Sequence, residues 1–282
     1  MLCPMHELSS SLGDTPDGPV RTVTRSRWTP NRICAEDEDE VVVEEPLEFR
    51  VGSLPIAVLM RTPGEDIDLA YGFMLTERIF DRAEQITRVA HCSQGEQPEN
   101  VVLVTPHPSF TLDVSRFARS FYTTSSCGIC GKRSIERALD EAPPLTEKKE
   151  FLAMVLATLP SLLLPLQPIF AMTGGLHAAA LCTAQGRLDC VREDIGRHNA
   201  VDKVIGWAAR SGTSLGQYAL VVSGRASYEI VQKALAARIS CVVAVGGASS
   251  LAIDLAERAG IALVGFVRSH QLSVYTQRHR IL

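Results

Sequence analysis

The strongest constraint on the fold is an alternation of two kinds of segment in the last third of the chain. Residues 217–224, 239–247 and 261–268 are short, apolar and rich in valine, as buried strands are, and the segments 226–238 and 249–260 between them favour helices. Strands that alternate with helices of this length pair in parallel through right-handed crossovers. The sequence therefore predicts an α/β fold with a mainly parallel sheet.

The rest of the chain divides by composition. Residues 1–40 are rich in Ser, Pro, Gly and Asp and end in the acidic run "AEDEDE", so we expect a disordered tail there. Residues 41–115 have the pattern of two strands, a helix and a further strand, which predicts a small α+β domain. Residues 116–282 are expected to form the α/β domain.

Two further segments of the α/β domain have a clear pattern. Residues 168–194 predict a strand, a bend at Gly174 and Gly175, and a second strand. Residues 195–212 predict an amphipathic helix that ends at Gly212.

Composition excludes several classes of function. The net charge is −4 and the sequence has no dense basic face, so a nucleic-acid partner is not expected. The most apolar run, residues 156–172, is interrupted by three prolines and does not predict a membrane span. The N-terminus lacks the order of a signal peptide. We expect a soluble cytoplasmic protein and, as the most common symmetric assembly, a homodimer.

A parallel sheet places the loops at the carboxyl ends of its strands along one edge, where ligands bind. The loops 223–227 and 246–250 lead into helix N-termini, whose free N–H groups and dipole favour an anion. Two such loops predict a phosphate-bearing ligand, while ordinary turn and cap chemistry is the alternative interpretation. The candidate ligand residues on this edge are Ser223, Gly224, Arg225, Ser249, Ser250 and Arg268.

Eight cysteines in a chain of this size without an export signal indicate reduced thiols rather than disulfides. Cys241 lies in an apolar strand segment and is expected to be a small buried hydrophobe. Cys127 and Cys130, in "SSCGICGKRS", have the spacing and surroundings for chemistry.

Three chemistries suit this CxxC pair. A structural zinc site needs four ligands, and the eight-residue spacing of Cys182 and Cys190 is poor for a second pair. Thioredoxin-like exchange needs a buried strand before the pair, where this chain has the polar run "RSFYTTSS". The third is sulfur transfer through a cysteine persulfide, which needs an exposed thiolate on a mobile loop.

The neighbours of the pair suit sulfur transfer. Gly128 and Gly131 allow the loop to move, and Lys132 and Arg133 favour the thiolate. Hydrolytic deamination of the cytidine deaminase type needs His-x-Glu, and the segment "LHAAA" has alanine in place of the glutamate.

Two histidines complete the candidate site. In "REDIGRHNAVDK", Arg197, His198 and Asp202 are spaced for one side of a helix, which fits either a salt-bridged helix start or a pocket wall. His177 follows Gly174 and Gly175, which permit the close approach of a ligand.

Several stretches together resemble one family, the formate dehydrogenase accessory proteins of the FdhD sulfur-carrier type. They are "SSCGICGK", "TGGLHAAAL", "REDIGRHNAVDKVIG", "SGRASYEIVQKA" and "SLAIDLAERAGIALVGFVR", with a closing "VYT", and they span most of residues 45–276. The resemblance implies a sulfurtransferase on a three-layer scaffold similar to the cytidine deaminase fold.

The resemblance also implies partners and sites. Sulfur would come from a cysteine desulfurase as a persulfide on Cys127, with Cys130 as its partner. The acceptor would be the molybdenum cofactor, in its bis-molybdopterin guanine dinucleotide form, destined for formate dehydrogenase. The alternatives are a cofactor-binding chaperone that moves no sulfur and a CxxC disulfide oxidoreductase. The implied cofactor-binding residues are Phe266, Val267, Arg268, Ser269, His270 and Gln271.

Overall fold

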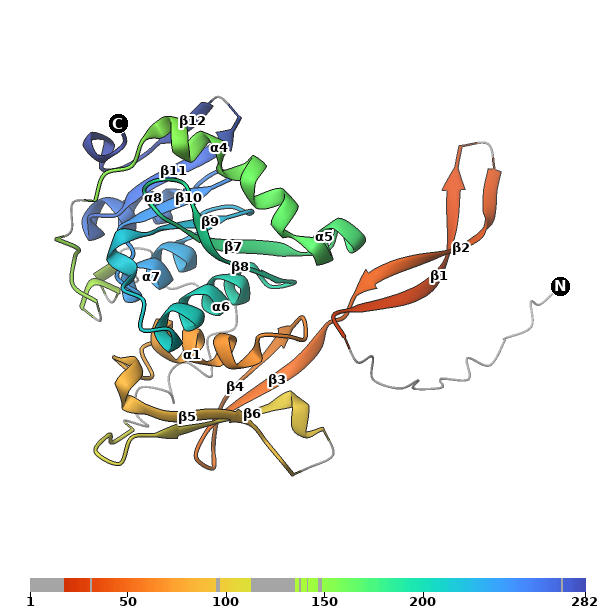
Figure 1. Ribbon diagram of the computed structural model, residues 1–282, viewed down its shortest axis with the longest axis horizontal. Coiled ribbons are helices and arrows are strands. Elements are labelled where there is room, and N and C mark those ends of the chain that lie inside the picture. The colour runs from red at the N-terminus through yellow and green to blue at the C-terminus, as the bar shows by residue number, and fades with distance from the viewer. Residues whose placement is uncertain are drawn as a thin grey trace.

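The computed structural model describes residues 18–30, 32–94, 97–112, 135–136, 138–140, 142–146, 149–269 and 271–282. The described residues form three sheets, which have two, four and six strands. In Figure 1 the six-stranded sheet, a layer of helices and the four-stranded sheet follow one another, and the two-stranded sheet projects to one side. Among these residues, no helix has both the length and the apolar character needed to cross a membrane.

The six-stranded sheet is mixed. Its strand order is β12-β11-β10-β9-β7-β8, and only the pairs β9–β10 and β10–β11 are parallel. The prediction of a mainly parallel sheet is therefore wrong outside these three strands. The short connections from β7 to β8 and from β11 to β12 reverse the chain, and such connections join antiparallel strands. The strands are β7 (His177–Cys182), β8 (Leu188–Asp194), β9 (Ala219–Val222), β10 (Cys241–Ala244), β11 (Ala262–Arg268) and β12 (Gln271–Val274).

Helices cover both faces of this sheet. Because side chains alternate along a strand, Ala178 and Ala180 of β7 pack in the cluster with α4, whereas Ala179 and Leu181 pack in the cluster with the other helices. Cys241 is fully buried in the α4 cluster, as predicted. The covering helices are α4 (Ala153–Leu163) on one face and α6 (Arg197–Arg210), α7 (Tyr228–Ala236) and α8 (Ser250–Ala259) on the other.

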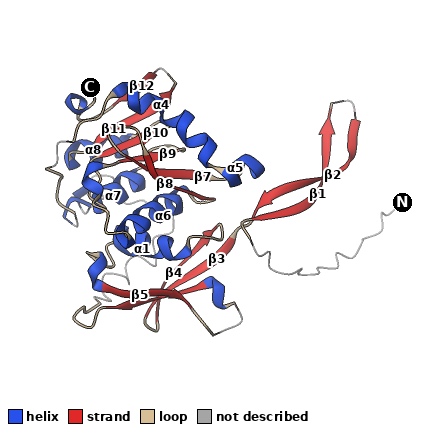
Figure 2. Cartoon of the chain, in the orientation of Figure 1, coloured by secondary structure: helices blue, strands red, loops and turns tan. Residues whose placement is uncertain are grey.

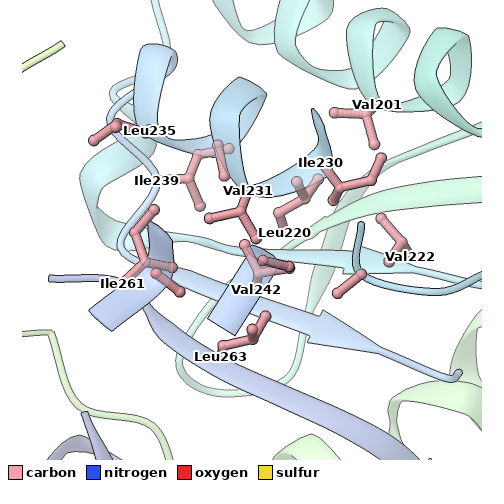
Figure 3. Close-up of a cluster of buried hydrophobic side chains, with 14 of the residues drawn as sticks. Val201, Leu220, Val222, Ile230, Val231, Leu235, Ile239, Val242, Ile261 and Leu263 are labelled. Atoms are coloured by element: carbon pink, nitrogen blue, oxygen red, sulfur yellow. The ribbon is translucent and has the colours of Figure 1, made fainter. Parts of the chain in front are cut away.

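The largest core cluster lies between the sheet and α6 to α8. Figure 3 shows Leu220, Val242 and Leu263 from three adjacent strands, which meet Val231 of α7 and Val201 of α6. All five side chains are fully buried. This packing holds the starts of α6, α7 and α8 at the edge of the sheet where their preceding strands end.

The four-stranded sheet and α1 (Asp66–Thr76) lie within residues 41–115. The helix α1 packs against α6 at two glycines. A Cβ on Gly72 would lie 1.8 Å from the carbonyl oxygen of Asp202, and a Cβ on Gly206 would lie 1.8 Å from that of Asp68. The strands are β3 (Glu45–Val51), β4 (Leu54–Arg61), β5 (Ile86–His91), which was not predicted, and β6 (Val101–Pro106).

The second half of the expected disordered tail is a β-hairpin. Strands β1 (Val20–Thr29) and β2 (Arg32–Val42) pair antiparallel and project from the body (Figure 2). Arginines of β1 face the acidic run of β2 across the hairpin, where Arg25 contacts Asp37 and Asp39 and Arg27 contacts Asp37. The prediction treated this part of the chain as a solvated, disordered extension, whereas pairing the strands brings opposite charges together. Residues 1–17 lie outside the described residues.

The segment 168–194 also differs from its prediction. Its first part is not a strand but the short helix α5 (Pro168–Thr173), with a proline at the first helical position. Gly174 ends this helix in the left-handed conformation, at a φ of 66°. The predicted bend is therefore a helix cap, and the turn of the hairpin lies instead between β7 and β8.

Candidate functional site

The loops that follow β9 and β10 meet at one edge of the six-stranded sheet, as their sequence predicts. The backbone N–H of Ala226 donates to the carbonyl oxygen of Gly247 (3.0 Å), and the N–H of Gly246 donates to that of Gly224 (2.9 Å). The N–H of Ser249 donates to the carbonyl oxygen of Ala226 (3.1 Å). These bonds hold the two loops side by side as a continuation of the sheet.

The exit of β11 joins the same edge. The N–H of Phe266 donates to the carbonyl oxygen of Gly246 (2.8 Å), and Nη1 of Arg268 donates to that of Val245 (2.8 Å). Phe266 has a φ of 50°, in the left-handed region that an aromatic residue rarely adopts, and its side chain is 52% exposed. A bulky residue held in this strained conformation and exposed to solvent is typical of a ligand-binding site.

His177, at the start of β7, lies beside the first loop. The N–H of the next residue, Ala178, donates to Oγ of Ser223 (2.9 Å), and a Cβ on Gly224 would lie 3.5 Å from Nδ1 of His177. Burial lowers the pKa of His177, and the nearby positive charge of Arg197 lowers it further. His177 is therefore a neutral imidazole near pH 7.

The first turn of α6 brings Arg197 and His198 to this edge. Burial lowers the pKa of His198 to about 4, with help from the charges of Arg197 and Lys233. Nε2 of His198 lies 4.0 Å from Oε2 of Glu229, too far for a hydrogen bond. Among the described residues, neither Nε2 of His198 nor Nε of Arg197 has a hydrogen-bond partner, although both atoms are buried. Buried polar groups are normally paired, so such atoms indicate a site that a ligand completes.

The other half of the "REDIGRHNAVDK" motif is structural. Oδ1 of Asp194 accepts from the N–H of Gly196 (2.8 Å) and from Nδ2 of Asn199 (2.9 Å), while Oδ2 lies 2.9 Å from Nζ of Lys203. Oδ2 of Asp202 accepts from Nζ of Lys233 (2.9 Å). The ion pairs of Asp194 and Asp202 therefore fit the interpretation as a salt-bridged helix start, and the pocket-wall interpretation of Arg197 and His198 stays a prediction.

The remaining predicted residues occupy different environments. Oγ of Ser249 accepts from the N–H of Ala252 (3.3 Å) and caps α8, which is the role that the alternative interpretation gives it. Ser250 is the exposed first residue of α8, and Arg225 is also exposed. The side chain of Val267 is fully buried in the core cluster with α4, so it does not line this edge. Ser269 and Gln271 are exposed, and His270 lies outside the described residues.

Cys127 and Cys130 also lie outside the described residues. Of the other cysteines, Cys182, Cys190 and Cys241 are buried, and burial raises the pKa of each thiol to about 12. These three thiols are protonated near pH 7 and are poor nucleophiles.

Glu229, in the first turn of α7, was not predicted as a site residue, and Arg197, in the first turn of α6, was predicted only under the pocket-wall interpretation. Their position in the sequence could have identified them, because each residue lies shortly after a strand that ends at the carboxyl edge of the six-stranded sheet. The arrangement as a whole combines three helix N-termini with Arg197, Arg225 and Arg268, and such a combination binds anions.

Comparison with known proteins agrees with the motifs. Residues 42–282 match the family model described as the FdhD/NarQ family. The chain is 45% identical over 255 residues to the sulfur carrier protein FdhD of Streptomyces avermitilis, covering 86% of this chain and 89% of that protein. It is 46% identical over 254 residues to the protein of the same name from Nocardia farcinica, covering 86% and 88%.

A solved structure has a similar fold. It is a crystal structure of a protein from Desulfotalea psychrophila described as a formate dehydrogenase accessory protein. The TM-score is 0.75 at 24% sequence identity, and the match covers 93% of this chain and 99% of the other.

Proposed function

The chain belongs to the FdhD/NarQ family, and from this premise we propose that it is a sulfur carrier for formate dehydrogenase that holds sulfur as a persulfide on Cys127. The names of its relatives support the carrier role. The "SSCGICGK" stretch supports the site, because its glycines and basic neighbours suit an exposed thiolate.

The loading step needs no external oxidant or reductant. The thiolate of Cys127 attacks the terminal sulfur of a donor persulfide, which a cysteine desulfurase supplies. The new sulfur–sulfur bond forms as the donor's bond breaks, and the donor leaves as a thiolate. Cys130 assists this exchange. The raised pKa values of Cys182, Cys190 and Cys241 support this assignment, because a buried protonated thiol does not attack a persulfide.

The single observation that supports a site for the sulfur acceptor is the arrangement of residues at the carboxyl edge of the six-stranded sheet. Its three helix N-termini and three arginines suit a phosphate-bearing substrate, and we propose the guanine dinucleotide form of the molybdenum cofactor. The exposed ring of Phe266 provides a surface on which a base could stack. The neutral imidazoles of His177 and His198 would accept hydrogen bonds from this substrate.

This proposal implies three partners, which are a cysteine desulfurase, the molybdenum cofactor and formate dehydrogenase, and the proposed location is the cytoplasm.

The test incubates the full chain with a cysteine desulfurase and cysteine, and maps bound sulfur by mass spectrometry under non-reducing conditions. We expect one added sulfur on the peptide that contains Cys127, and its loss in Cys127→Ser. Cys182→Ser is the control that should load normally.

The same experiment separates the alternatives. A chaperone that only holds the cofactor would carry no added sulfur on this peptide, which would defeat the carrier proposal. A disulfide oxidoreductase would instead show a Cys127–Cys130 disulfide after reaction with an oxidised substrate. Cys130→Ser reports whether the second thiol is needed, because unchanged loading and release would make Cys127 sufficient.

A further inference from the structure

The end of β11 contains an irregularity at the carboxyl edge of the six-stranded sheet. The pairing of β11 with β12 loses its regular register between Gly265 and Arg268. In this interval β11 contains Phe266 and Val267, whereas β12 contains only Leu272. One strand thus has an extra residue relative to its partner, which is the arrangement of a β-bulge.

The bulge decides which side chain of β11 enters the core. Side chains alternate along a regular strand, so Phe266 would follow Val264 into the core cluster with α4. The extra residue instead brings Val267 into that cluster, where it is fully buried, and leaves Phe266 exposed with a φ of 50°. A strained conformation of this kind persists only where the surrounding contacts enforce it.

Arg268 makes contacts that enforce this conformation. Its Nη1 donates to the carbonyl oxygen of Val267 (3.0 Å), within the bulge, and to that of Val245 (2.8 Å), in the loop after β10. Beside these bonds, the N–H of Phe266 donates to the carbonyl oxygen of Gly246 (2.8 Å). Hydrogen bonds from a charged donor are roughly twice as strong as neutral ones, so the guanidinium fastens the bulge to the neighbouring loop.

These bonds distinguish Arg268 from an arginine that only contacts phosphate. An Nη nitrogen has two hydrogens, and both hydrogens of Nη1 are directed to backbone carbonyls, so this nitrogen is not available to a ligand. The charge of the group still contributes to the anion-binding edge. The contact is specific to arginine, because the planar guanidinium presents its donors in a fixed geometry that the ammonium group of lysine lacks.

We propose that Arg268 is a positioning residue, which holds Phe266 in its exposed, left-handed conformation so that the ring can receive the base of the nucleotide. This inference rests on the nucleotide site proposed above and assigns Arg268 a contribution to the binding of the base, beside its attraction for phosphate. Arg268 therefore matters even for a nucleoside that has no phosphate.

The test measures the binding of guanosine, which has no phosphate, and of guanosine diphosphate to the full chain by equilibrium dialysis. In Arg268→Met we expect the affinity for guanosine to fall roughly tenfold, within the range of one lost stacking contact. Arg268→Lys keeps the charge but not the planar donors, so it should also bind guanosine more weakly than the parent protein. The matched control is Arg258→Met, which removes an exposed arginine from the last turn of α8 and should bind both probes normally.

Two further measurements show whether Arg268 acts through the ring. In Arg268→Met the amide hydrogen of Phe266 should exchange with solvent faster, which hydrogen exchange with mass spectrometry detects without any nucleotide. In a Phe266→Ala background, Arg268→Met should cause no further loss of affinity for guanosine, because the ring that it positions is gone. Circular dichroism establishes that each variant is folded, and Arg268→Lys carries the test if Arg268→Met does not fold.

The outcomes separate this inference from the nucleotide site on which it rests. A parent protein that binds neither guanosine nor guanosine diphosphate defeats the nucleotide site itself. A parent protein that binds both, with Arg268→Met weakened only toward the diphosphate, overturns the positioning role and makes Arg268 a phosphate ligand. Unchanged exchange at the amide of Phe266 in a folded Arg268→Met variant overturns the positioning role as well.

Discussion

The ring of Phe266 lies directly against the backbone of Gly247. A Cβ on Gly247 would lie 2.7 Å from Cζ of the ring, closer than real carbon atoms approach. The glycine thus leaves room for an aromatic side chain that is itself held in the left-handed conformation. The loop after β10 and the exit of β11 therefore form one surface.

Replacing this glycine should damage nucleotide binding more than stability. In Gly247→Ala the new methyl group displaces the exposed ring, and we expect the affinity for guanosine diphosphate, used as a probe of the edge, to fall by roughly tenfold, within the range of one lost stacking contact. Isothermal titration calorimetry measures this change. Gly18→Ala is the control, because no atom of the described part of the chain lies within 4 Å of its added Cβ. An unchanged affinity in Gly247→Ala would remove the case for stacking on Phe266.

The strain at Phe266 predicts a trade-off between stability and binding. Asparagine tolerates the left-handed conformation, so Phe266→Asn should leave the free energy of unfolding unchanged or raise it by about 1 kcal/mol. The same variant should bind guanosine diphosphate more weakly, because the ring is gone. Chemical denaturation and calorimetry provide the two values. A variant that loses both stability and binding would show that the ring is structural.

The lowered pKa of His198 predicts how stability depends on pH. In the folded protein this imidazole becomes protonated only near pH 4, whereas in the unfolded chain it does so near pH 6.5. Between these values the unfolded chain binds more protons, so the free energy of unfolding should fall as the pH drops from about 6.5 toward 4. The loss due to His198 should be on the order of 1 kcal/mol, since the side chain is partly exposed.

Urea denaturation at pH 7, 6 and 5 measures this dependence. His198→Gln removes the titrating group and should flatten the decline relative to the parent protein. His279→Gln is the control, because that side chain is exposed near the C-terminus, and it should follow the parent curve. Equal slopes for the parent and His198→Gln would show that the burial of this ring does not oppose its protonation.

Local patterns were sufficient for most of the α/β region. The segments around Val221, Val243 and Val264 are apolar on both sides, and their helices follow directly, so strand positions, parallel pairing and the meeting of the two loops were all predictable. The capping role of Ser249 was predicted as the alternative interpretation, because serine is a preferred residue at the N-cap of a helix.

Other features depended on contacts between distant residues. Pairing of β1 with β2 requires Arg25 to meet Asp37 across a turn, which composition alone cannot reveal. The strands β7 and β8 run antiparallel because a turn of a few residues joins them, and this antiparallel pair is one reason that the sheet is mixed. His198 and Asp202 have the spacing of helical neighbours, yet one lies at the edge of the sheet and the other is buried against Lys233.

The sequence by itself determined the family, the helix and strand types of the last third of the chain, and the loops that could hold an anion. These depend on neighbouring residues: periodicity, caps and motifs that are read along the backbone. Only the tertiary structure decided that Val267 points into the core while Phe266 is exposed, and that buried atoms of Arg197 and His198 have no hydrogen-bond partner among the described residues. Burial and hydrogen-bond pairing are properties of the packed molecule, because atoms far apart in the chain create them.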